Sequence, residues 1–528
     1  MAKLSLLLPT LLAMTMTITT TSCSASRVLP LTSDPPRASY KILMLLPLSS
    51  RSHRTIFLTL ARALADRGHK VELLVNHEPT TPYPNVTEIY HGLDHFKEEK
   101  FRLFSSRERP WEIFRLLREG LPAMTRDLYR NPAVWDLYLR RTQFDVVFID
   151  NFYNQMAYPF AQGLPYISVS ASGMDHTQSS LLGNVLNPAY VTAIPVEFPQ
   201  PLSFFHRVLN LAVHLCSGFI RYYVILPSIQ REITAIFPEV PPLAELERNL
   251  SLALYNSHFA MGRVLPLLPS QVEIGTMHCR PGSPLPQDLT EWIESAGAAG
   301  VVYFSLGTVA LGNTMPERWR DLFVRAFRRL PQRVVWKYEG ELEGVSENVL
   351  IRGWLPQQDI LAHPNVKVFI THGGMLSTQE AMYHATPMLL LPIFADQPRN
   401  AHVAQEGGVG LMLGWGDLSV QLIVDAVGRL VADGRYKANI QAVSSALKDQ
   451  PETPLERAVF WTEYVIRHQG APRLKSPAAE LSWMEYFMID IILLVHLLVI
   501  AFYLLCCHAS RFLCRKVLPQ NKTRRKCE

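Results

Sequence analysis

The sequence predicts an α/β protein with two doubly wound domains, followed by one C-terminal transmembrane helix. Apolar runs of strand length alternate with helical stretches, and this pattern occurs twice along the chain. A long apolar stretch, residues 486–507, lies close to the C-terminus. Of the 528 residues, 48% are apolar and 18% are charged, which excludes a largely disordered chain and is typical of a protein with buried or membrane-embedded length.

The chain begins with a predicted signal peptide, residues 1–25. Lys3 supplies one positive charge, Leu4–Leu12 form a short apolar core, and the small residues Ser22–Ser26 surround the expected cleavage point. This order of charge, apolar core and small residues is typical of secretion signals. We therefore expect the chain to enter the secretory pathway.

The first domain is predicted to span residues 26–274. Tyr40–Pro47 is an apolar run of strand length, Leu48–His53 is a polar loop, a helical stripe then ends at Gly68, and Lys70–Val75 is the next strand. Strand, helix and strand in so short a segment form a βαβ unit, which requires a parallel sheet with both faces buried. Further strands of this domain are expected at Phe144–Ile149 and Pro165–Val169.

One apolar stretch of the first domain has no unique interpretation. Leu202–Pro227 is rich in large apolar residues, but Arg207 and Arg221 interrupt it and leave too short an uncharged run to cross a bilayer. Two interpretations of this stretch remain open. It could form buried helices of an acceptor pocket, or it could form a surface patch at a membrane interface.

The strand and helix pattern begins again in a second predicted domain, residues 275–455. Proline-rich stretches lie near the boundary, at Pro238–Pro242 and Pro266–Pro286. The expected strands are Val301–Ser305, Val334–Trp336, Val366–Thr371 and Met388–Leu391. The expected helices lie near Glu317–Leu330, Ser377–Tyr383 and Asn400–Gln405. These lengths fit a second doubly wound domain.

The end of the chain predicts a single-pass membrane anchor. After a helical segment and linker at 456–485, residues 486–507 are long enough to span a bilayer as a helix, with Asp490 near one end. The tail, 508–528, has seven basic residues and one acidic residue, so the positive-inside bias places it in the cytosol. The chain's net charge of +5 is therefore a topology signal and does not indicate nucleic-acid binding.

Cysteines and glycosylation sequons agree with a lumenal location of the two domains. Only Cys216 and Cys279 clearly lie on the translocated side, so a disulfide framework is excluded, although one bridge between them stays open. Asn85 and Asn249 begin sequons and are candidate glycosylation sites. Lys526, preceded by two arginines, resembles a dilysine-type signal for retrieval to the endoplasmic reticulum.

The segment Thr371–Glu380 is the part of the sequence most clearly suited to binding a ligand. In an open α/β sheet, ligands bind at the carboxyl ends of the strands. Here a predicted buried strand leads through Gly373 and Gly374 into a helix, where backbone N–H groups and the helix dipole favour an anion. A diphosphate is the expected ligand. Side chains that could assist are His372, Ser377 and Thr378, with Glu380 suited to a ribose diol.

Several motifs together resemble the membrane-bound animal UDP-glycosyltransferases. They are Phe304–Thr308, Gly353–Gln357, His363–Pro364, Thr371–Gly374, Asp396–Pro398 and Arg457–Trp461. The resemblance covers nearly the whole chain, including the signal, the two domains and the anchor. It implies a GT-B-like fold with two facing Rossmann-like domains, the first for the acceptor and the second for a UDP-sugar.

The resemblance also implies roles for donor-binding residues. Trp354 would stack on uracil, Gln357 would bond its edge, and Glu380 would hold the ribose. Asp396 and Gln397 would face the donor sugar. The residues implied near the phosphates or uridine are Ser305, Gly307, Thr308, His372, Gly373, Gly374, Ser377 and Thr378. Leu376 stands where many relatives have Asn, so one phosphate contact is expected to be missing or replaced.

The catalytic pair implied by the family comes from the first domain. His53 follows the first strand and would act as general base, because a hydroxyl must lose its proton as it attacks the sugar. Asp150 ends a strand and would orient the histidine and stabilise its protonated form. The chain has no Asp-x-Asp pair, so no metal and no cofactor beyond the UDP-sugar co-substrate is expected.

The sequence therefore predicts an inverting, metal-independent transferase of the endoplasmic reticulum membrane, facing the lumen. It would move glucose, or alternatively glucuronic acid, to a hydroxyl of a small lipophilic acceptor. Glucose is favoured because the run after Gly374 resembles invertebrate members. A non-catalytic lipophile-binding protein of the same fold is the alternative. A single-pass receptor is disfavoured by the short tail, and a homo-oligomer stays open.

Overall fold

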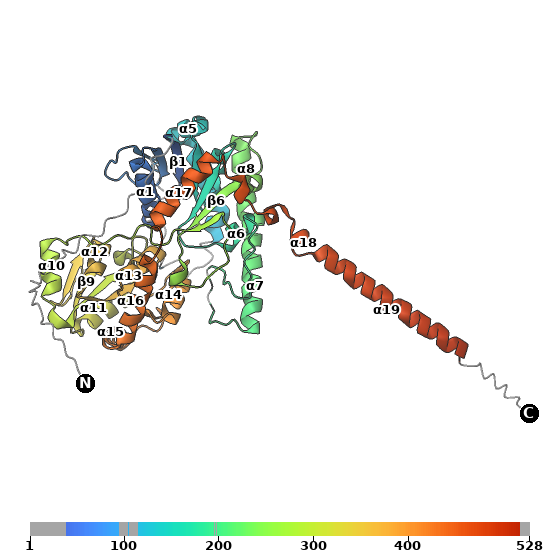
Figure 1. Ribbon diagram of the computed structural model, residues 1–528. Helices are drawn as coiled ribbons and strands as arrows, with labels where there is room; N and C mark the ends of the chain where they lie inside the picture. The colour runs from blue at the N-terminus through green and yellow to red at the C-terminus, as the bar shows by residue number, and fades with distance from the viewer. Residues whose placement is uncertain (1–37, 94–103, 105–113, 195, 197, 518–528) are drawn as a thin grey trace, which may run out of the picture. The chain divides into compact units, whose positions relative to one another are not determined.

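The computed structural model describes residues 38–93, 104, 114–194, 196 and 198–517. The predicted signal peptide (1–25) and the end of the tail with Lys526 lie outside the described residues. The described chain contains two parallel sheets, and helices cover both (Figure 1).

The first sheet has seven parallel strands in the order β3-β2-β1-β4-β5-β6-β7. Strand β1 is an interior strand that pairs with β2 on one side and β4 on the other, so the strand order reverses between β1 and β4. The strands are β1 (Lys41–Leu46), β2 (Lys70–Val75), β3 (Val86–Tyr90), β4 (Val146–Asp150), β5 (Tyr166–Ser170), β6 (Leu250–Tyr255) and β7 (Gln271–Glu273).

The second sheet has six parallel strands in the order β10-β9-β8-β11-β12-β13. Its order also reverses beside its first strand, here between β8 and β11, as in a doubly wound nucleotide-binding fold. The strands are β8 (Val301–Ser305), β9 (Arg333–Lys337), β10 (Val349–Arg352), β11 (Val366–Thr371), β12 (Met388–Leu390) and β13 (Gly410–Met412).

Helices bury both faces of each sheet, which is why the central strands are apolar throughout. With the first sheet are α1 (Arg51–Asp66), α4 (Leu121–Arg130), α5 (Pro132–Leu139), α6 (His176–Leu181), α7 (Phe204–Phe219), α8 (Leu226–Ile236) and α9 (Leu243–Arg248). With the second are α10 (Gln287–Glu294), α11 (Glu317–Arg328), α12 (Gln357–Ala362), α13 (Met375–Tyr383), α14 (Gln397–Glu406), α15 (Val420–Ala432) and α16 (Gly434–Lys448).

The segment Leu48–His53, predicted as a loop, is partly helical in the structure. Helix α1 begins at Arg51, and its N-cap Ser50 accepts a hydrogen bond from the backbone N–H of His53. The start of this helix is difficult to recognise in the sequence, because its first turn is polar and the apolar stripe of the helix begins only at Ile56. His53 therefore has a fixed backbone at a helix start.

Helix α7 corrects one of the two interpretations of Leu202–Pro227. A continuous helical segment, Phe204–Ile236, runs from α7 through a π-helical turn into α8. The α8 half packs into the core of the first domain through Ile229 and Ile233, and Arg221 pairs with buried Glu247. The α7 half has a single buried residue, Asn210, so a buried helix is the wrong description for it.

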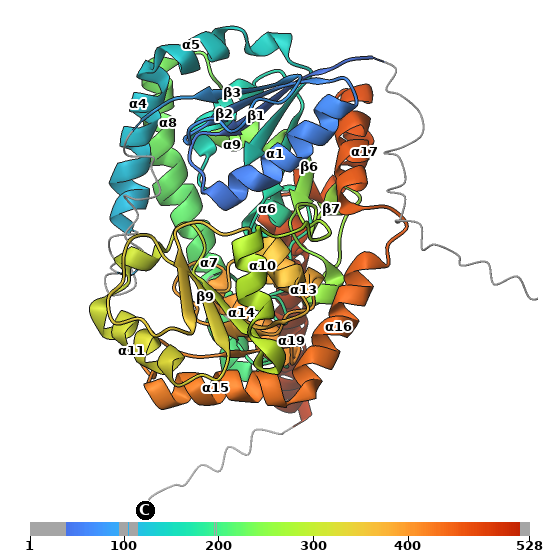
Figure 2. The ribbon, with the colours of Figure 1, turned by 90° about the vertical axis from the view of Figure 1, so that its left-hand side faces the viewer.

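Helix α17 (Pro454–Arg467) returns the chain to the first domain after the second domain is complete. It packs beside α1 and β6 (Figure 2). At this contact the Arg67 guanidinium donates two hydrogen bonds to the Glu463 carboxylate, at 2.5 and 3.0 Å, and His69 Nε2 lies 3.1 Å from the same carboxylate. The Arg67 and Glu463 side chains are only 8% and 6% exposed.

The C-terminal apolar helix begins later and ends later than the span predicted at 486–507. After α18 (Trp483–Tyr486), helix α19 runs from Ile489 to Val517. By its length and its apolar composition, this helix could cross a membrane. Phe204–Ile236 is also long and apolar enough, although its α8 half is buried in the first domain. Cys216 and Cys279 are both free thiols, so the bridge left open between them is not formed.

The ion pair between α1 and α17 predicts a stability effect. Glu463→Ala removes the buried carboxylate that pairs with the Arg67 guanidinium and with His69, so we expect the free energy of unfolding to fall by about 3–5 kcal/mol. Burial opposes ionisation of Glu463, but the hydrogen bonds from Arg67 and His69 outweigh it and lower its pKa. The contribution of this pair is therefore present at neutral pH and is lost as the pH falls through that lowered pKa.

Urea unfolding of the full chain in detergent measures this loss. Asp136→Ala is the control, because the Asp136 side chain is 76% exposed and its pair with Arg140 is expected to contribute less than about 1 kcal/mol. Equal stability of the two variants would contradict the importance of the α17 contact.

Candidate active site

His53 and Asp150 meet at the carboxyl ends of β1 and β4. Because these two strands are neighbours in a parallel register, the first turn of α1 lies beside the last residue of β4. His53 Nδ1 is 2.8 Å from Asp150 Oδ2, and the two side chains are 12% and 0% exposed. The structure thus brings together the two residues that the sequence predicts as a catalytic pair.

The contact fixes which nitrogen of His53 can act as a base. A carboxylate only accepts hydrogen bonds, so with Asp150 ionised Nδ1 carries the proton and Nε2 has the lone pair. The ring of Phe152 packs edge-on against the imidazole, with the ring centroids 5.3 Å apart. The imidazole is held from two sides, as a proton acceptor of fixed orientation requires.

Two glycines of the second domain enclose the ring of His372. A Cβ atom added to Gly307 would lie 2.7 Å from His372 Cε1, and one added to Gly374 would lie 2.4 Å from His372 Nε2. Gly307 also has a φ of +82°, which side chains other than glycine rarely adopt. The glycines that the sequence associates with a diphosphate therefore also make room for this imidazole.

His372 is a neutral histidine in this environment. Burial, with a smaller effect of the positive charge on Lys337, lowers the pKa of His372 to about 4. Lys337 ends β9, is itself buried, and donates a hydrogen bond to the carbonyl of Gly307 at 2.9 Å. It also pairs with Glu339.

Gln357, Ser377 and Glu380 form a hydrogen-bonded cluster beside α13. Gln357 Nε2 donates to Ser377 Oγ at 3.0 Å and to Glu380 Oε2 at 2.6 Å, and Gln357 Oε1 accepts from the hydroxyl of Tyr303. The other oxygen of Glu380 lies 3.5 Å from Nε2 of His278. The cluster holds a carboxylate in a defined position.

His278 is a buried neighbour of that carboxylate. Burial opposes a positive charge on His278, but its neighbours Cys279 and Glu380 outweigh burial and raise the pKa of His278 to about 10. His278 is therefore a cation at neutral pH, in a segment between β7 and α10 that the sequence reading left without a role.

Asp396 and Gln397 begin α14 at the carboxyl end of β12. Asn400 Nδ2 donates to Asp396 Oδ2 at 2.7 Å, and the side-chain oxygen of Gln397 accepts from the backbone N–H groups of Ile393 and Phe394. Burial raises the pKa of Asp396, while Arg399, Asn400 and His53 lower it. The Arg399 side chain on α14 donates a hydrogen bond to the carbonyl of Ser172 at 2.8 Å, so loops of the two domains meet beside Asp396.

Some residues that the sequence predicts to bind the UDP-sugar lie outside the hydrogen-bonded clusters described above. Ser305, at the end of β8, accepts a hydrogen bond from Gly307 N, and Thr308 follows in the same half-buried turn. Trp354 is 67% exposed. Thr378 differs most, because its buried hydroxyl has no hydrogen-bond partner among the residues that the structure describes.

Thr378 instead lines a cavity of about 140 Å³ between the two domains. This interdomain cavity is bounded by the segment Tyr190–Thr192 of the first domain and by helices α13 and α14 of the second. Many of its lining side chains are apolar, and they include Met174, Met261, Leu265, Met375, Met382 and Val403.

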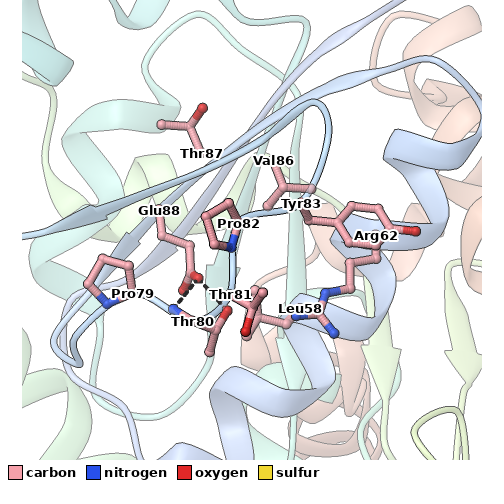
Figure 3. A pocket seen from close by; sticks show the side chains of 10 residues that line it. All are labelled: Leu58, Arg62, Pro79, Thr80, Thr81, Pro82, Tyr83, Val86, Thr87 and Glu88. Atoms are coloured by element: carbon pink, nitrogen blue, oxygen red, sulfur yellow. Dashed lines mark hydrogen bonds between the residues drawn. The ribbon is translucent and has the colours of Figure 1, made fainter.

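A larger hollow, of about 220 Å³, lies at the β3 edge of the first sheet (Figure 3). It is lined by residues of α1 and of the segment Pro79–Glu88. Glu88 accepts hydrogen bonds from the backbone and hydroxyl of Thr80 and from Arg54. Both oxygens of the Glu88 carboxylate are therefore already engaged in contacts within the protein. None of the predicted site residues lines it.

Sequence reasoning missed Lys337 and His278. Lys337 carried a weak signal, because it directly follows the apolar run Val334–Trp336, whereas His278 has no motif and reaches Glu380 only through the fold. Both predicted sequon asparagines, Asn85 and Asn249, are exposed, and their glycosylation stays a prediction.

Comparison with known proteins gives a consistent result. Residues 38–525 match the family model described as UDP-glucoronosyl and UDP-glucosyl transferase. The chain is 34% identical to "UDP-glycosyltransferase UGT5" of Dactylopius coccus, over 88% of this chain and 91% of the relative. It is 33% identical to "UDP-glucosyltransferase 2" of the same insect, over 90% and 93%.

Among solved structures, a UDP-glucosyltransferase from Polygonum tinctorium superposes with a TM-score of 0.55 at 16% identity, covering 81% of this chain and 99% of that one. At this identity the likeness concerns the fold alone. Together with the two doubly wound sheets, it confirms the GT-B-like fold that the sequence predicts.

The contacts of His278 with Cys279 and Glu380 predict a pH-dependent stability. Because the folded-state pKa of His278 is raised, its stabilising effect is complete below the ordinary histidine pKa and is lost as the pH rises towards 10. His278→Gln should therefore reduce the free energy of unfolding by about 3 kcal/mol at pH 6, with a smaller difference at pH 10. Unfolding in urea at several pH values measures it.

The exposed His468 provides the matched variant, His468→Gln, which should change little at any pH. A loss for His278→Gln that stays constant between pH 6 and pH 10 would contradict a charged His278.

Proposed function

This chain belongs to the UDP-glucuronosyl and UDP-glucosyl transferase family, and from that premise we propose its detailed reaction. It transfers a hexosyl group, glucose in preference to glucuronic acid, from a UDP-sugar to a hydroxyl of a small lipophilic acceptor. The observation that carries this proposal is the buried His53–Asp150 pair at the carboxyl ends of β1 and β4.

The proposed reaction is a single displacement. The acceptor oxygen attacks the anomeric carbon of the sugar and forms the new C–O bond as the bond to the UDP oxygen breaks. His53 Nε2 takes the hydroxyl proton, and Asp150 stabilises the imidazolium that results. Attack opposite the leaving group inverts the anomeric carbon, so an α-linked UDP-sugar gives a β-glycoside.

Residues of the second domain would bind the donor. Trp354 is exposed and thus available for stacking on uracil, and the Gln357–Glu380 cluster presents an amide and a carboxylate for uridine. Glu380 is suited to a ribose diol because a carboxylate accepts two hydrogen bonds. Asp396 would face the sugar.

The charge on the leaving UDP would be stabilised without a metal ion. The backbone N–H groups at the start of α13 favour an anion, and the buried ammonium group of Lys337 lies beside Gly307. Neutral His372 could donate one hydrogen bond to a phosphate oxygen. These groups replace the donors that an Asn at position 376 would have supplied.

The interdomain cavity supports a lipophilic acceptor. Its methionine, leucine and valine side chains suit a hydrocarbon ring, while Arg263, Glu273 and Arg399 also line it, and its volume of about 140 Å³ is close to that of a cavity that holds benzene. Asn400, which lines the cavity, also bonds Asp396, so an apolar group bound there would lie next to the donor sugar.

We further propose that the enzyme is a type I protein of the endoplasmic reticulum, with both domains in the lumen. The basic tail supports this orientation through the positive-inside bias. Exposed Asn85 and Asn249 agree with it, because glycosylation takes place on the lumenal side.

Replacing the general base tests the function directly. For His53→Ala, we expect acceptor-dependent UDP release to fall by about 10²–10⁴-fold, because the acceptor then loses its proton to water alone. UDP affinity, measured by calorimetry, should not change, since His53 belongs to the other domain. His468→Ala is the control and should keep full turnover. Unchanged release by His53→Ala would contradict its role as the base.

The donor is tested by competition between UDP-glucose and UDP-glucuronate, with one simple phenol as acceptor and mass spectrometry of the product. We expect the glucoside to dominate, because the carboxylate of glucuronate would lie near buried Asp396. A relative named "UDP-glucosyltransferase 2" supports the same choice. In Asp396→Asn the ratio of glucuronide to glucoside should rise. A dominant glucuronide in the unmodified chain would contradict the preference for glucose.

A further inference from the structure

Helix α7 directs Asn210 and His214 towards the domain and large apolar side chains outward, with the exposed Arg207 over the ring of Phe204. Asn210 is its one buried residue, and its amide donates to the carbonyls of Pro188 and Val191 and accepts from Ala193 N–H. His214 Nε2, one turn later, lies 3.1 Å from the carbonyl of Val191. A helix on the surface of a soluble domain shows the opposite arrangement, with apolar residues towards the core.

The outward surface of α7 is formed by large apolar side chains. Their exposed fractions range from 41% to 75%, although each is a residue type that normally lies inside a protein. We call this surface the α7 face; it consists of Phe204, Phe205, Val208, Leu209, Leu211, Leu215, Phe219 and Tyr223. Its members recur at three- and four-residue spacing, so they form one continuous patch.

The α7 face lies close to the point where the chain leaves for the membrane. A Cβ atom added to Gly183, just after α6, would lie 2.6 Å from the backbone nitrogen of Ala479, so the segment before α18 packs there. Helix α6 in turn packs on α7, with the rings of His176 and His214 only 4.2 Å apart. Figure 1 shows α7 on the side from which α18 and α19 leave the domain.

We propose that the α7 face is inserted into the surface of the same bilayer that α19 crosses. An amphipathic helix with an apolar face of Phe and Leu residues binds at the boundary between headgroups and acyl chains. Trp483 and Phe487, both exposed beside the start of α19, belong to residue types that favour this depth. The helix lies on the membrane and does not cross it, because Asn210, His214 and Arg221 bind it to the domain.

This placement gives the interdomain cavity a position near lipid. The segment Tyr190–Thr192, which lines that cavity, is held by the hydrogen bonds of Asn210 and His214 from the inner side of α7. A compound dissolved in the membrane would thus reach the neighbourhood of the cavity without passing through bulk water. The docking of α7 itself does not depend on the proposed reaction.

The test uses the full chain in phosphatidylcholine nanodiscs, with a nitroxide label on Leu215→Cys in a background where the native cysteines are serine. Collision rates of the label are measured with oxygen, which concentrates in lipid, and with a water-soluble nickel chelate. We expect the ratio of oxygen to nickel collisions to be several-fold higher at position 215 than at Arg435→Cys, whose native side chain on α16 is 82% exposed. Phe205→Cys, on the same face, should behave like position 215.

Two results would overturn the proposal. Equal ratios at positions 215 and 435 would mean that the α7 face is open to water. Low collision rates with both reagents at positions 205 and 215 would mean that protein covers the face, and a nanodisc mass equal to two chains would identify a second copy as the cover. Because the labelled positions are exposed, the label itself is not expected to disturb folding.

Discussion

The hydrogen bond between His53 and Asp150 depends on one constraint, that β1 and β4 are neighbours with parallel register. The two residues are far apart in the chain, and only this pairing places the start of α1 beside the end of β4. Between β1 and β4 the strand order reverses, so the helices that follow the two strands lie on opposite faces and leave space at the carboxyl ends. The base of the proposed reaction occupies that space.

In the second sheet, the pairing of neighbouring strands likewise positions the residues proposed to bind the UDP-sugar. Strands β8, β11 and β12 are consecutive neighbours, so the turn with Gly307, the loop with His372 and the start of α14 with Asp396 lie next to one another. Packing then adjusts their chemistry: two glycines accept the ring of His372, and burial keeps that ring neutral next to buried Lys337. Thus the topology brings the groups together and the local packing sets their charge.

The sequence predicts best where a local pattern is sufficient. The predicted bounds of β2, β8 and β11 agree with the structure, because each strand is mainly apolar and most of its residues are buried. Strand β3, a partly exposed edge strand with alternating residues, was missed. The role of His278 could not be found, since its distance to Glu380 is a result of tertiary packing. Whether α7 was buried or exposed also required the fold, because its apolar residues allow both.

The return of α17 to the first domain means that the two domains are joined by two covalent crossings, one between β7 and α10 and one between α16 and α17. A single linker would permit bending and twisting in every direction. Two crossings define an axis, and they restrict the large motions of one domain against the other to rotation about the line between them. Since the Glu463 contact fixes the far end of the second crossing on the first domain, such a rotation would leave α17 in place beside α1.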